Sequence, residues 1–193
     1  MKQKDITLTP LKLIKEIGIF DLDPCGFNGH KTANKLYLLP KEDGLQKEWF
    51  GKVWLNPPYS ETIKWIKKMA KHNNGIACVL ASTETKWFQE YVLKRANSIF
   101  FLESRPKFLN NKFKVVNLMR GVVLVSYGDC IEMLRECTLQ GTFVELNNTS
   151  TRYSAYGTKS KPEVNSPCLS QNNTKEDGFP PTPKGMGIQP TIL

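Results

Sequence analysis

Short apolar runs alternate with amphipathic stretches along the first 145 residues, a pattern that predicts strands alternating with helices. Runs that are apolar along almost their whole length are typical of strands buried on both faces. These features predict an α/β fold with a mostly parallel sheet and helices on both faces. The predicted strands are IFDLDPCG (19–26), KVWL (52–55), GIACVLA (75–81), SIFFLE (98–103) and the β-branched part of LMRGVVLVSYG (118–128).

Helical periodicity and capping residues predict helices between these strands. Thr9 is a candidate N-cap for the first helix, Pro10 suits its first position and Gly18 ends it. Ser60 is a candidate N-cap for the second helix, which has one apolar face and one face of lysines. The predicted helices cover residues 9–18, 60–72, 85–96 and 131–137.

The composition changes near residue 146. Residues 146–193 are rich in Ser, Thr, Asn, Pro, Gly and Lys and poor in aliphatic side chains. Such a segment cannot bury enough apolar surface to offset its chain entropy. The sequence therefore predicts one domain over residues 1–145, followed by a disordered polar tail over residues 146–193.

The chain carries a formal net charge of +9, which favours an anionic partner. Nucleic acid is the first candidate and an anionic membrane surface the second, while a basic, solvated surface is the plain alternative. Five scattered cysteines without a C-x-x-C pair, and no secretory signal, indicate an intracellular protein with reduced thiols. The spacing of His30 and His72 argues against a zinc site, and no apolar run approaches membrane-spanning length.

The sequence NPPY (Asn56, Pro57, Pro58 and Tyr59) follows the apolar run KVWL directly. Two prolines stiffen the backbone and stop strand pairing, so Asn56 is held at the end of a strand. The Asn56 amide oxygen and the Pro57 carbonyl can accept the two hydrogens of one exocyclic amine, and Tyr59 can stack on its ring. This is the chemistry of an amino-group methyltransferase, whose motif IV the sequence resembles. The alternative is a structural Pro-Pro turn that ends a strand.

The resemblance extends beyond four residues. Thr9-Pro10, FDLDPCG, EDGLQKEWFGKVWLNPPYS, ASTETKWF and RPKF follow one another as in the phage-type DNA N6-adenine methyltransferase family. The resemblance covers roughly residues 7–126. It implies S-adenosylmethionine as methyl donor, adenine in DNA as acceptor, and a Rossmann-like methyltransferase fold with NPPY at the catalytic strand end. No metal is needed, because the methyl sulfonium is already activated.

The segment that faces the methyl donor departs from the usual pattern. No glycine-rich F-x-G-x-G loop follows the first predicted strand, which Pro24 and Gly26 stop. The resemblance implies that Asp23, Pro24 and Cys25 lie against the methionine part of the donor, where Asp23 pairs with its ammonium group. An aspartate that closes a turn is an equally good interpretation. The same two interpretations hold for Asp43, near the donor's ribose or adenine. The resemblance adds Pro10 and Asn56 to the donor site.

Only residues 24–52 separate DPCG from KVWLNPPY, which leaves room for one short extra strand. The usual number of strands before the catalytic motif is therefore reduced.

Basic side chains are candidate DNA contacts. One group lies on the predicted second helix, where a solvated lysine face is the simpler interpretation. A second group follows the strand 98–103 and includes RPKF, where Ser104 replaces a glycine common in the family. Cations interleaved with aromatic side chains suit phosphates and unstacked bases. The residues assigned to DNA are Lys64, Arg105, Lys107 and Phe108.

The sequence therefore predicts a DNA adenine-N6 methyltransferase, encoded by a phage or prophage and working in the bacterial cytoplasm on DNA, most simply double-stranded. The same motif also suits cytosine N4, an RNA adenine or a protein glutamine, because each presents an amine conjugated to a π-system. A non-catalytic nucleic-acid-binding protein on a decayed methyltransferase scaffold is the alternative from another class. The sequence leaves the recognition site and the oligomeric state open.

Overall fold

The computed structural model describes residues 7–38 and 41–146. The chain divides into two compact units, Met1–Arg152 and Tyr153–Leu193, and every described residue belongs to the first. The predicted polar tail lies outside the described residues from position 147 onward and stays a prediction.

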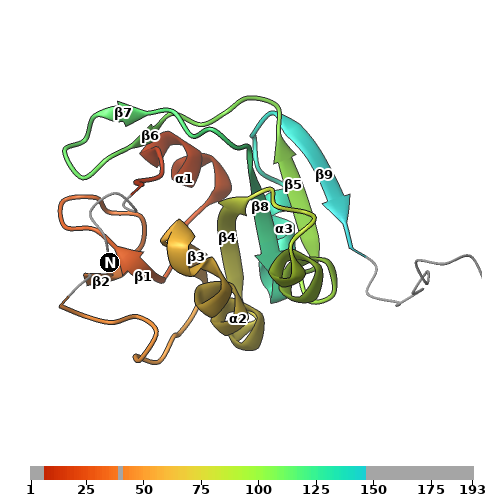
Figure 1. The fold of residues 1–193 in the computed structure, drawn as a ribbon, viewed down its shortest axis with the longest axis horizontal. Coiled ribbons are helices and arrows are strands. Elements are labelled where there is room, and N and C mark those ends of the chain that lie inside the picture. Colours follow the sequence, from red (N-terminus) through yellow and green to blue (C-terminus); the bar gives the residue numbers. More distant parts are fainter. Residues whose placement is uncertain (1–6, 39–40, 147–193) are drawn as a thin grey trace, which may run out of the picture. The chain divides into compact units, whose positions relative to one another are not determined.

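A seven-stranded sheet forms the centre of the first unit, in the order β2-β1-β3-β4-β8-β5-β9 (Figure 1). Two further strands, β6 (Phe108–Leu109) and β7 (Val115–Val116), form a separate hairpin. The five predicted strands are confirmed, and the short extra strand before the NPPY motif is β2. The sheet consists of β1 (Leu22–Gly26), β2 (Lys35–Leu38), β3 (Val53–Leu55), β4 (Gly75–Leu80), β5 (Ser98–Leu102), β8 (Val122–Tyr127) and β9 (Gly141–Glu145).

The sheet is mixed, which corrects the prediction of a mostly parallel one. Strands β2, β1, β3 and β4 are parallel, whereas β8 is antiparallel to both β4 and β5. The reason is the connection from β5 to β8, which contains the β6–β7 hairpin and no crossover helix that would return the chain in the same direction. The sequence of an apolar strand such as β8 does not show its direction, because a strand covered on both faces is apolar along its whole length.

Helices cover both faces of the sheet, as predicted. Residues of α2 and η3 share one core cluster with Val53 and Leu55, and residues of α1 and α3 share the other with Trp54. The third predicted helix differs in type, since η3 is a π-helix. The helical elements are α1 (Leu11–Ile17), η2 (Tyr59–Glu61), α2 (Thr62–His72), η3 (Phe88–Leu93), η4 (Gly128–Cys130) and α3 (Ile131–Arg135).

The structure corrects both predicted helix caps. Pro10, and not Thr9, is the N-cap of α1, and no side chain caps that helix. Ser60 lies inside the 3-10 turn η2, so α2 begins only at Thr62. The buried face of α2 consists of Thr62, Trp65, Ile66 and Met69, and Ile63 is exposed.

The carboxyl ends of β1, β3, β4 and β5 meet at one edge of the sheet. Strands β1, β3 and β4 are parallel, and β5 runs in the same direction because both β4 and β5 are antiparallel to β8. Strand β8 begins at this edge, where Val122 faces Leu80. We call this edge, with the loops that follow β1, β3, β4 and β5 and precede β8, the carboxyl edge.

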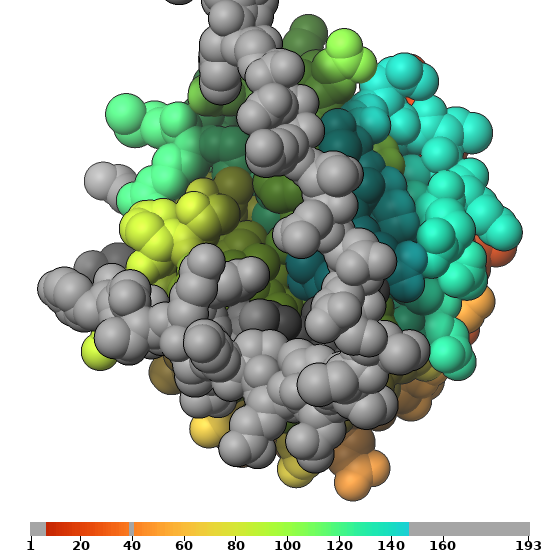
Figure 2. All heavy atoms as spheres, turned by 90° about the vertical axis from the view of Figure 1, so that its right-hand side faces the viewer, coloured from red at the N-terminus to blue at the C-terminus, as the bar shows by residue number. Residues whose placement is uncertain are grey.

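The edge strand β9 was not predicted. It pairs with β5 over five residues, and most of its side chains are exposed. Figure 2 shows the cyan end of the described chain at the surface on this side. Its sequence TFVE is too short for the hydrophobic pattern to separate it from the polar segment that follows. Among the described residues, no helix has the length and apolar character needed to cross a membrane.

Candidate active site

The NPPY motif lies on the carboxyl edge, immediately after β3. Asn56 is half-buried, Pro57 and Pro58 are buried, and the turn η2 begins at Tyr59. Both prolines lack the N–H that would extend the ladder with β4, so the chain leaves the sheet at this point. The local order of strand, NPPY and helix is the one that the sequence predicts.

The Asn56 amide has one fixed end and one open end. Its Nδ2 atom donates a hydrogen bond to the Thr7 carbonyl at 2.6 Å. Its Oδ1 atom is buried, and no donor in the described part of the chain reaches it. A buried acceptor without a partner costs about 1–3 kcal/mol, a cost that a donor on a ligand would relieve.

Tyr59 presents a neutral phenol beside this amide. The side chain is largely buried, and burial raises the pKa of its hydroxyl above the ordinary value of 10.0. The backbone at this position is held by Thr62, whose hydroxyl donates to the Tyr59 carbonyl at 3.1 Å. The aromatic ring is therefore fixed at the start of η2.

The Asp23 carboxylate closes a turn, which is the second of the two interpretations left open by the sequence. Its Oδ1 atom accepts from the Cys25 N–H at 2.8 Å, and its Oδ2 atom accepts from the Thr32 hydroxyl. Burial nevertheless raises the pKa of Asp23 to about 6, and these two hydrogen bonds only moderate the rise. Asp23 therefore pays a burial cost when it ionises, and a cationic partner would relieve that cost.

Pro24 lies inside β1 and does not stop it, which corrects the prediction. The register shifts between Asp23 and Gly26, where the strand is irregular. The pairing of β1 with β3 involves only Leu22, so the missing N–H of Pro24 removes no bond of that ladder.

The loop after β2 folds back onto this segment. Asp43 also closes a turn, since its Oδ1 atom accepts from the Leu45 N–H at 2.9 Å. Gly44 lies so close to β1 that an added Cβ atom would stand 2.2 Å from the Pro24 carbonyl oxygen. The glycine is required by this approach, which brings Asp43 next to the DPCG segment.

The charges around Cys25 show that the DPCG segment, the loop at Asp43 and the NPPY turn lie close together. Burial raises the pKa of the Cys25 thiol, and the negative charges of Asp23, Asp43 and Glu61 raise it further. Glu61 belongs to η2, directly after NPPY. The structure therefore brings the two predicted donor-site segments and the NPPY turn into one neighbourhood.

Lys68 is an anchor for the loop at residues 44–47 and does not belong to a purely solvated lysine face. Its Nζ atom donates to the carbonyls of Gly44 at 3.0 Å and Leu45 at 2.8 Å, and also to that of Lys47. It lies 5.2 Å from the centre of the Trp49 ring. Sequence periodicity missed this role, because a lysine that bonds backbone carbonyls has the same helical position as a solvated one.

Replacement of Lys68 by methionine is expected to lower the free energy of unfolding by about 1–3 kcal/mol, because three backbone carbonyls lose a charged donor. Lys67→Met, at an exposed position of the same helix, is the matched control and should change stability by less than about 0.5 kcal/mol. Urea unfolding of both variants checks this. Equal effects would show that the loop does not depend on Lys68.

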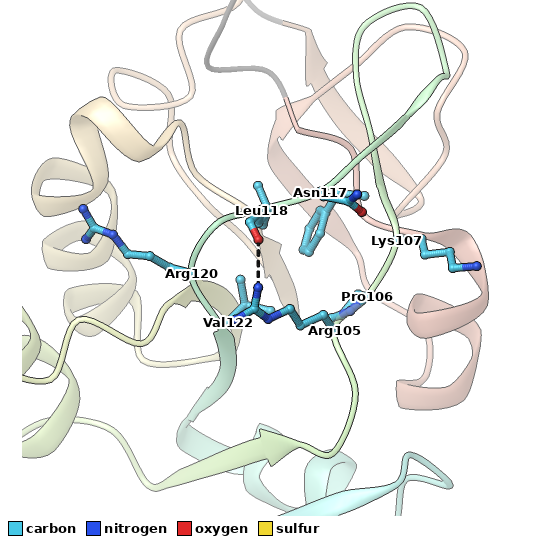
Figure 3. Close-up of a pocket in the computed structure, with 8 residues that line it drawn as sticks. Arg105, Pro106, Lys107, Asn117, Leu118, Arg120 and Val122 are labelled. Carbon is cyan, nitrogen blue, oxygen red and sulfur yellow. Dashed lines mark hydrogen bonds between the residues drawn. The ribbon is translucent and has the colours of Figure 1, made fainter.

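A cavity of about 340 Å³ opens on the carboxyl edge between the segments that precede β6 and β8 (Figure 3). Arg105 spans it, and its guanidinium donates to the Leu118 carbonyl at 3.3 Å. Arg120 extends out of the cavity and donates to the Ser82 hydroxyl, just beyond the carboxyl end of β4, at 3.3 Å. The cavity is lined by Arg105, Pro106, Lys107, Phe108, Asn117, Leu118, Arg120 and Val122.

The predicted DNA contacts lie in different environments. Arg105 and Lys107 are exposed, and Lys107 points away from the cavity in Figure 3. Lys64 is exposed and forms an ion pair with Glu61 at 2.7 Å. Phe108 is fully buried in the core, although it also lines the cavity. Arg120 was missed by sequence reasoning, which assigned only Arg105, Lys107 and Phe108 of this segment to DNA. Its position just before an apolar strand was the available sign.

The opposite edge of the sheet carries a group of carboxylates. A hollow there lies between the end of α1, Lys52 and the segment after β8. The exposed Arg105, Lys107 and Arg120 lie at the carboxyl edge instead. The carboxylates that line the hollow are Glu16, Asp129, Glu132 and Glu136.

The segment Thr7–Thr9, which we call the strap, crosses the carboxyl edge beside Asn56. Leu8 pairs with Leu109 of β6 through two backbone hydrogen bonds of 2.7 and 2.9 Å. Pro10, assigned to the donor site from the sequence, follows the strap directly and lies at the start of α1. Sequence reasoning missed the strap, because backbone carbonyls that act on a site leave no mark in the residue types.

Among the described residues, no group of three or more His, Cys, Asp or Glu side chains is placed to hold a metal ion.

Comparison with known proteins gives one family. A family model described as DNA N-6-adenine-methyltransferase (Dam) matches residues 1–126. A DNA N-6-adenine-methyltransferase of Haemophilus phage HP1 is 32% identical over 99 residues, which are 48% of this chain and 57% of that protein. One of Escherichia phage T1 is 35% identical over 112 residues, 52% of this chain and 46% of that protein. The chain spans about half the length of these relatives, and no solved structure matches it.

Proposed function

Since the chain belongs to the DNA N-6-adenine-methyltransferase (Dam) family, we propose that it transfers a methyl group from S-adenosylmethionine to the exocyclic N6 amine of adenine in DNA. The resemblance seen in the sequence is thereby confirmed at the level of the family. The observation that carries the proposal is the Asn56 amide. Its buried Oδ1 atom lacks a donor among the described residues, and an exocyclic amine supplies one.

The acceptor is handled by the NPPY motif. Asn56 Oδ1 and the Pro57 carbonyl accept the two hydrogens of the adenine amine, which draws the nitrogen lone pair out of conjugation with the ring. Tyr59 stacks on the base, and its phenol stays neutral because burial raises its pKa. Pro58 keeps the turn rigid, so that these groups are aligned before the base arrives.

The donor site is supported by the chemistry of Asp23. A buried carboxylate with a raised pKa accepts a cation readily, and the ammonium group of S-adenosylmethionine is one. Asp23, Pro24, Cys25 and Asp43 would hold the donor, with Pro10 at its rim. Bound S-adenosylmethionine supplies an activated methyl sulfonium. We infer a variant of the Rossmann-like methyltransferase fold, in which the DPCG turn replaces the usual glycine loop.

The charge distribution supports DNA as the partner. Arg105, Lys107 and Arg120 are exposed on the carboxyl edge, with Lys64 on the neighbouring helix, while carboxylates line the opposite edge. Phosphates are therefore attracted to the edge that carries NPPY. The cavity beside Arg105 lies on this edge and offers room for an unstacked base. Because the similar proteins named above are phage proteins, we propose a phage or prophage origin and action in the bacterial cytoplasm.

The proposal is tested by incubating the full chain with labelled S-adenosylmethionine and duplex DNA from a methylation-free host, followed by nucleoside analysis. N6-methyladenine is the expected product. A matched DNA amplified with N6-methyl-dATP in place of dATP should take up no label, because its adenines present no NH₂ group.

Other products would identify the alternatives. N4-methylcytosine, formed equally on both DNAs, would keep the mechanism of NPPY and change the acceptor. Label on RNA or on protein glutamine would move the acceptor outside DNA. Absence of any product, together with absence of donor binding in calorimetry, would favour a non-catalytic nucleic-acid-binding protein.

A further inference from the structure

The strap joins the Asn56 amide to two other elements of the carboxyl edge. The Thr7 carbonyl accepts from Asn56 Nδ2 at 2.6 Å, and the Thr9 carbonyl bonds to His30 Nε2 at 2.7 Å. Between them, Leu8 is held on both sides of its peptide by Leu109. Three consecutive residues are thus fixed by three partners, of which one is the proposed catalytic amide.

His30 is a buried donor whose only ring-nitrogen bond in the described structure goes to the strap. Burial lowers the pKa of its imidazole below 6.5, which favours the neutral ring near pH 7. A carbonyl can only accept, so the bond requires a proton on Nε2. The ring therefore keeps the Thr9 carbonyl in place in the neutral form of the histidine.

The tip of the β6–β7 hairpin contacts His30 through Phe113. The centres of the two rings are 6.3 Å apart, and Phe113 also makes an edge contact with Phe27 at 6.0 Å. Phe113 is in the left-handed region, with a φ of 56°, which is unfavourable for an aromatic residue. Asn110 stabilises this turn. Its carbonyl accepts from the Phe113 N–H, and its side-chain Oδ1 atom accepts from the backbone N–H groups of Lys112 and Lys114.

The hairpin therefore holds the strap at two places, through Leu109 at the end of β6 and through Phe113 and His30 at the turn. The same hairpin carries the exposed Lys112 and Lys114. These contacts form a continuous path from the hairpin to the Thr7 carbonyl, and so to the amide that bonds to it.

We propose that His30 and Phe113 are positioning residues of the methyltransferase: acting through the strap, they orient the Asn56 amide so that Oδ1 faces the acceptor, and they couple DNA contact at the hairpin to that orientation. The inference rests on the proposed function for its kinetic part. Misplacement of a catalytic group by about 1 Å costs on the order of 10²-fold in rate, so the expected effect lies in kcat.

The kinetic test compares His30→Ala, Phe113→Ala and the conservative His30→Gln on duplex DNA. The two alanine variants should lower kcat about 10- to 100-fold, with the donor dissociation constant unchanged within about twofold. His30→Gln should restore most of the rate, because its amide N–H can replace the imidazole donor. The control is Phe50→Ala, since Phe50 is 50% exposed and Phe113 49%, and Phe50 precedes β3 at the opposite edge.

A second measurement is independent of activity. The side-chain NH₂ resonances of Asn56, identified by their absence in Asn56→Ala, should show one proton shifted by the bond to the Thr7 carbonyl. In His30→Ala and Phe113→Ala this shift should shrink, and in His30→Gln and Phe50→Ala it should remain. Unchanged Asn56 resonances in both alanine variants would overturn the proposal. Alanine variants that keep the wild-type kcat and only melt at a lower temperature would also overturn it, because their role would then be purely structural.

The kinetic and NMR measurements test the proposed function and the positioning role separately. Wild-type protein without turnover on any acceptor would contradict the proposed function, while the resonances would still decide whether the strap holds Asn56. Turnover in the wild type with no loss of kcat in the alanine variants would contradict the positioning role alone. Should His30→Ala fail to fold, Phe113→Ala and His30→Gln still decide the outcome, because the side chain of Phe113 is half-exposed.

Discussion

Asn56→Ala is expected to reduce methyl transfer to adenine about 10³-fold while the dissociation constant of S-adenosylmethionine changes by less than about twofold. The reason is the division of labour at the carboxyl edge. The proposed function assigns the buried acceptor Asn56 Oδ1 chiefly to the amine, and Asp23 and Asp43 to the donor. Removing the amide removes an interaction with the reacting amine and leaves the donor segments intact.

Single-turnover rates and calorimetric donor titrations measure the two halves of this prediction. Asn34→Ala is the matched control, because Asn34 is an exposed asparagine next to the amino end of β2. It should leave both quantities unchanged. Asn56→Asp is the sharper variant, since aspartate keeps an acceptor oxygen but cannot donate to the Thr7 carbonyl and repels it instead.

If the rate depends only on an acceptor at this position, Asn56→Asp will retain activity, and the bond to Thr7 will be irrelevant to catalysis. If orientation matters, Asn56→Asp will be as inactive as Asn56→Ala. Loss of donor binding in Asn56→Ala would contradict the role assigned to this residue, because it would place the amide in the donor site.

The position of the NPPY motif at the end of a strand was predictable, because the information for it is local. Two prolines after an apolar run end a strand whatever the rest of the chain does, and Ser60 to His72 had to become helical soon afterwards. The helix start was displaced to Thr62, because the 3-10 turn of Tyr59–Glu61 takes up the residues that a cap would have used. Local sequence thus predicted the position of the motif, but not the residue at which the following helix begins.

The direction of β8 was not predictable from the same kind of information. Its six residues are buried, and a strand covered on both faces has no polar side to reveal its partner. The connection held the missing information: residues 104–121 contain no helical period, so the chain returns through a hairpin. The strap, Lys68 and Arg120 were missed for a related reason, since each acts through a contact between segments far apart in sequence.

Asp23→Asn is expected to make the free protein more stable and the donor complex weaker. The pKa of the buried Asp23 is about 6, against an ordinary value of 3.8. At pH 3 the carboxyl is protonated in both the folded and the unfolded chain, so burial costs nothing through ionisation. As pH rises through 4 to 6, the unfolded chain loses this proton first, and the folded state of the wild type loses about 3 kcal/mol of stability.

Asparagine escapes this cost, because it is neutral at every pH and can keep both turn contacts. Its Oδ1 atom accepts from the Cys25 N–H, and its amide donates to the Thr32 hydroxyl oxygen. The variant should match the wild type near pH 3 and melt roughly 5–10 °C higher at pH 7.5. Asp129→Asn is the control, since Asp129 is exposed and relieves no burial when neutralised.

Donor affinity decides between the two interpretations of Asp23. If the carboxylate pairs with the ammonium group of S-adenosylmethionine, Asp23→Asn will weaken donor binding by about 2 kcal/mol or more, roughly 30-fold, in the same sample that gains stability. A stability gain with unchanged affinity would show that Asp23 only closes its turn. A stability difference that stays flat from pH 4 to 7.5 would contradict a buried ionised carboxylate altogether. Asp23 costs stability in the free protein at a position where asparagine would make the same turn, and a bound cation would offset that cost.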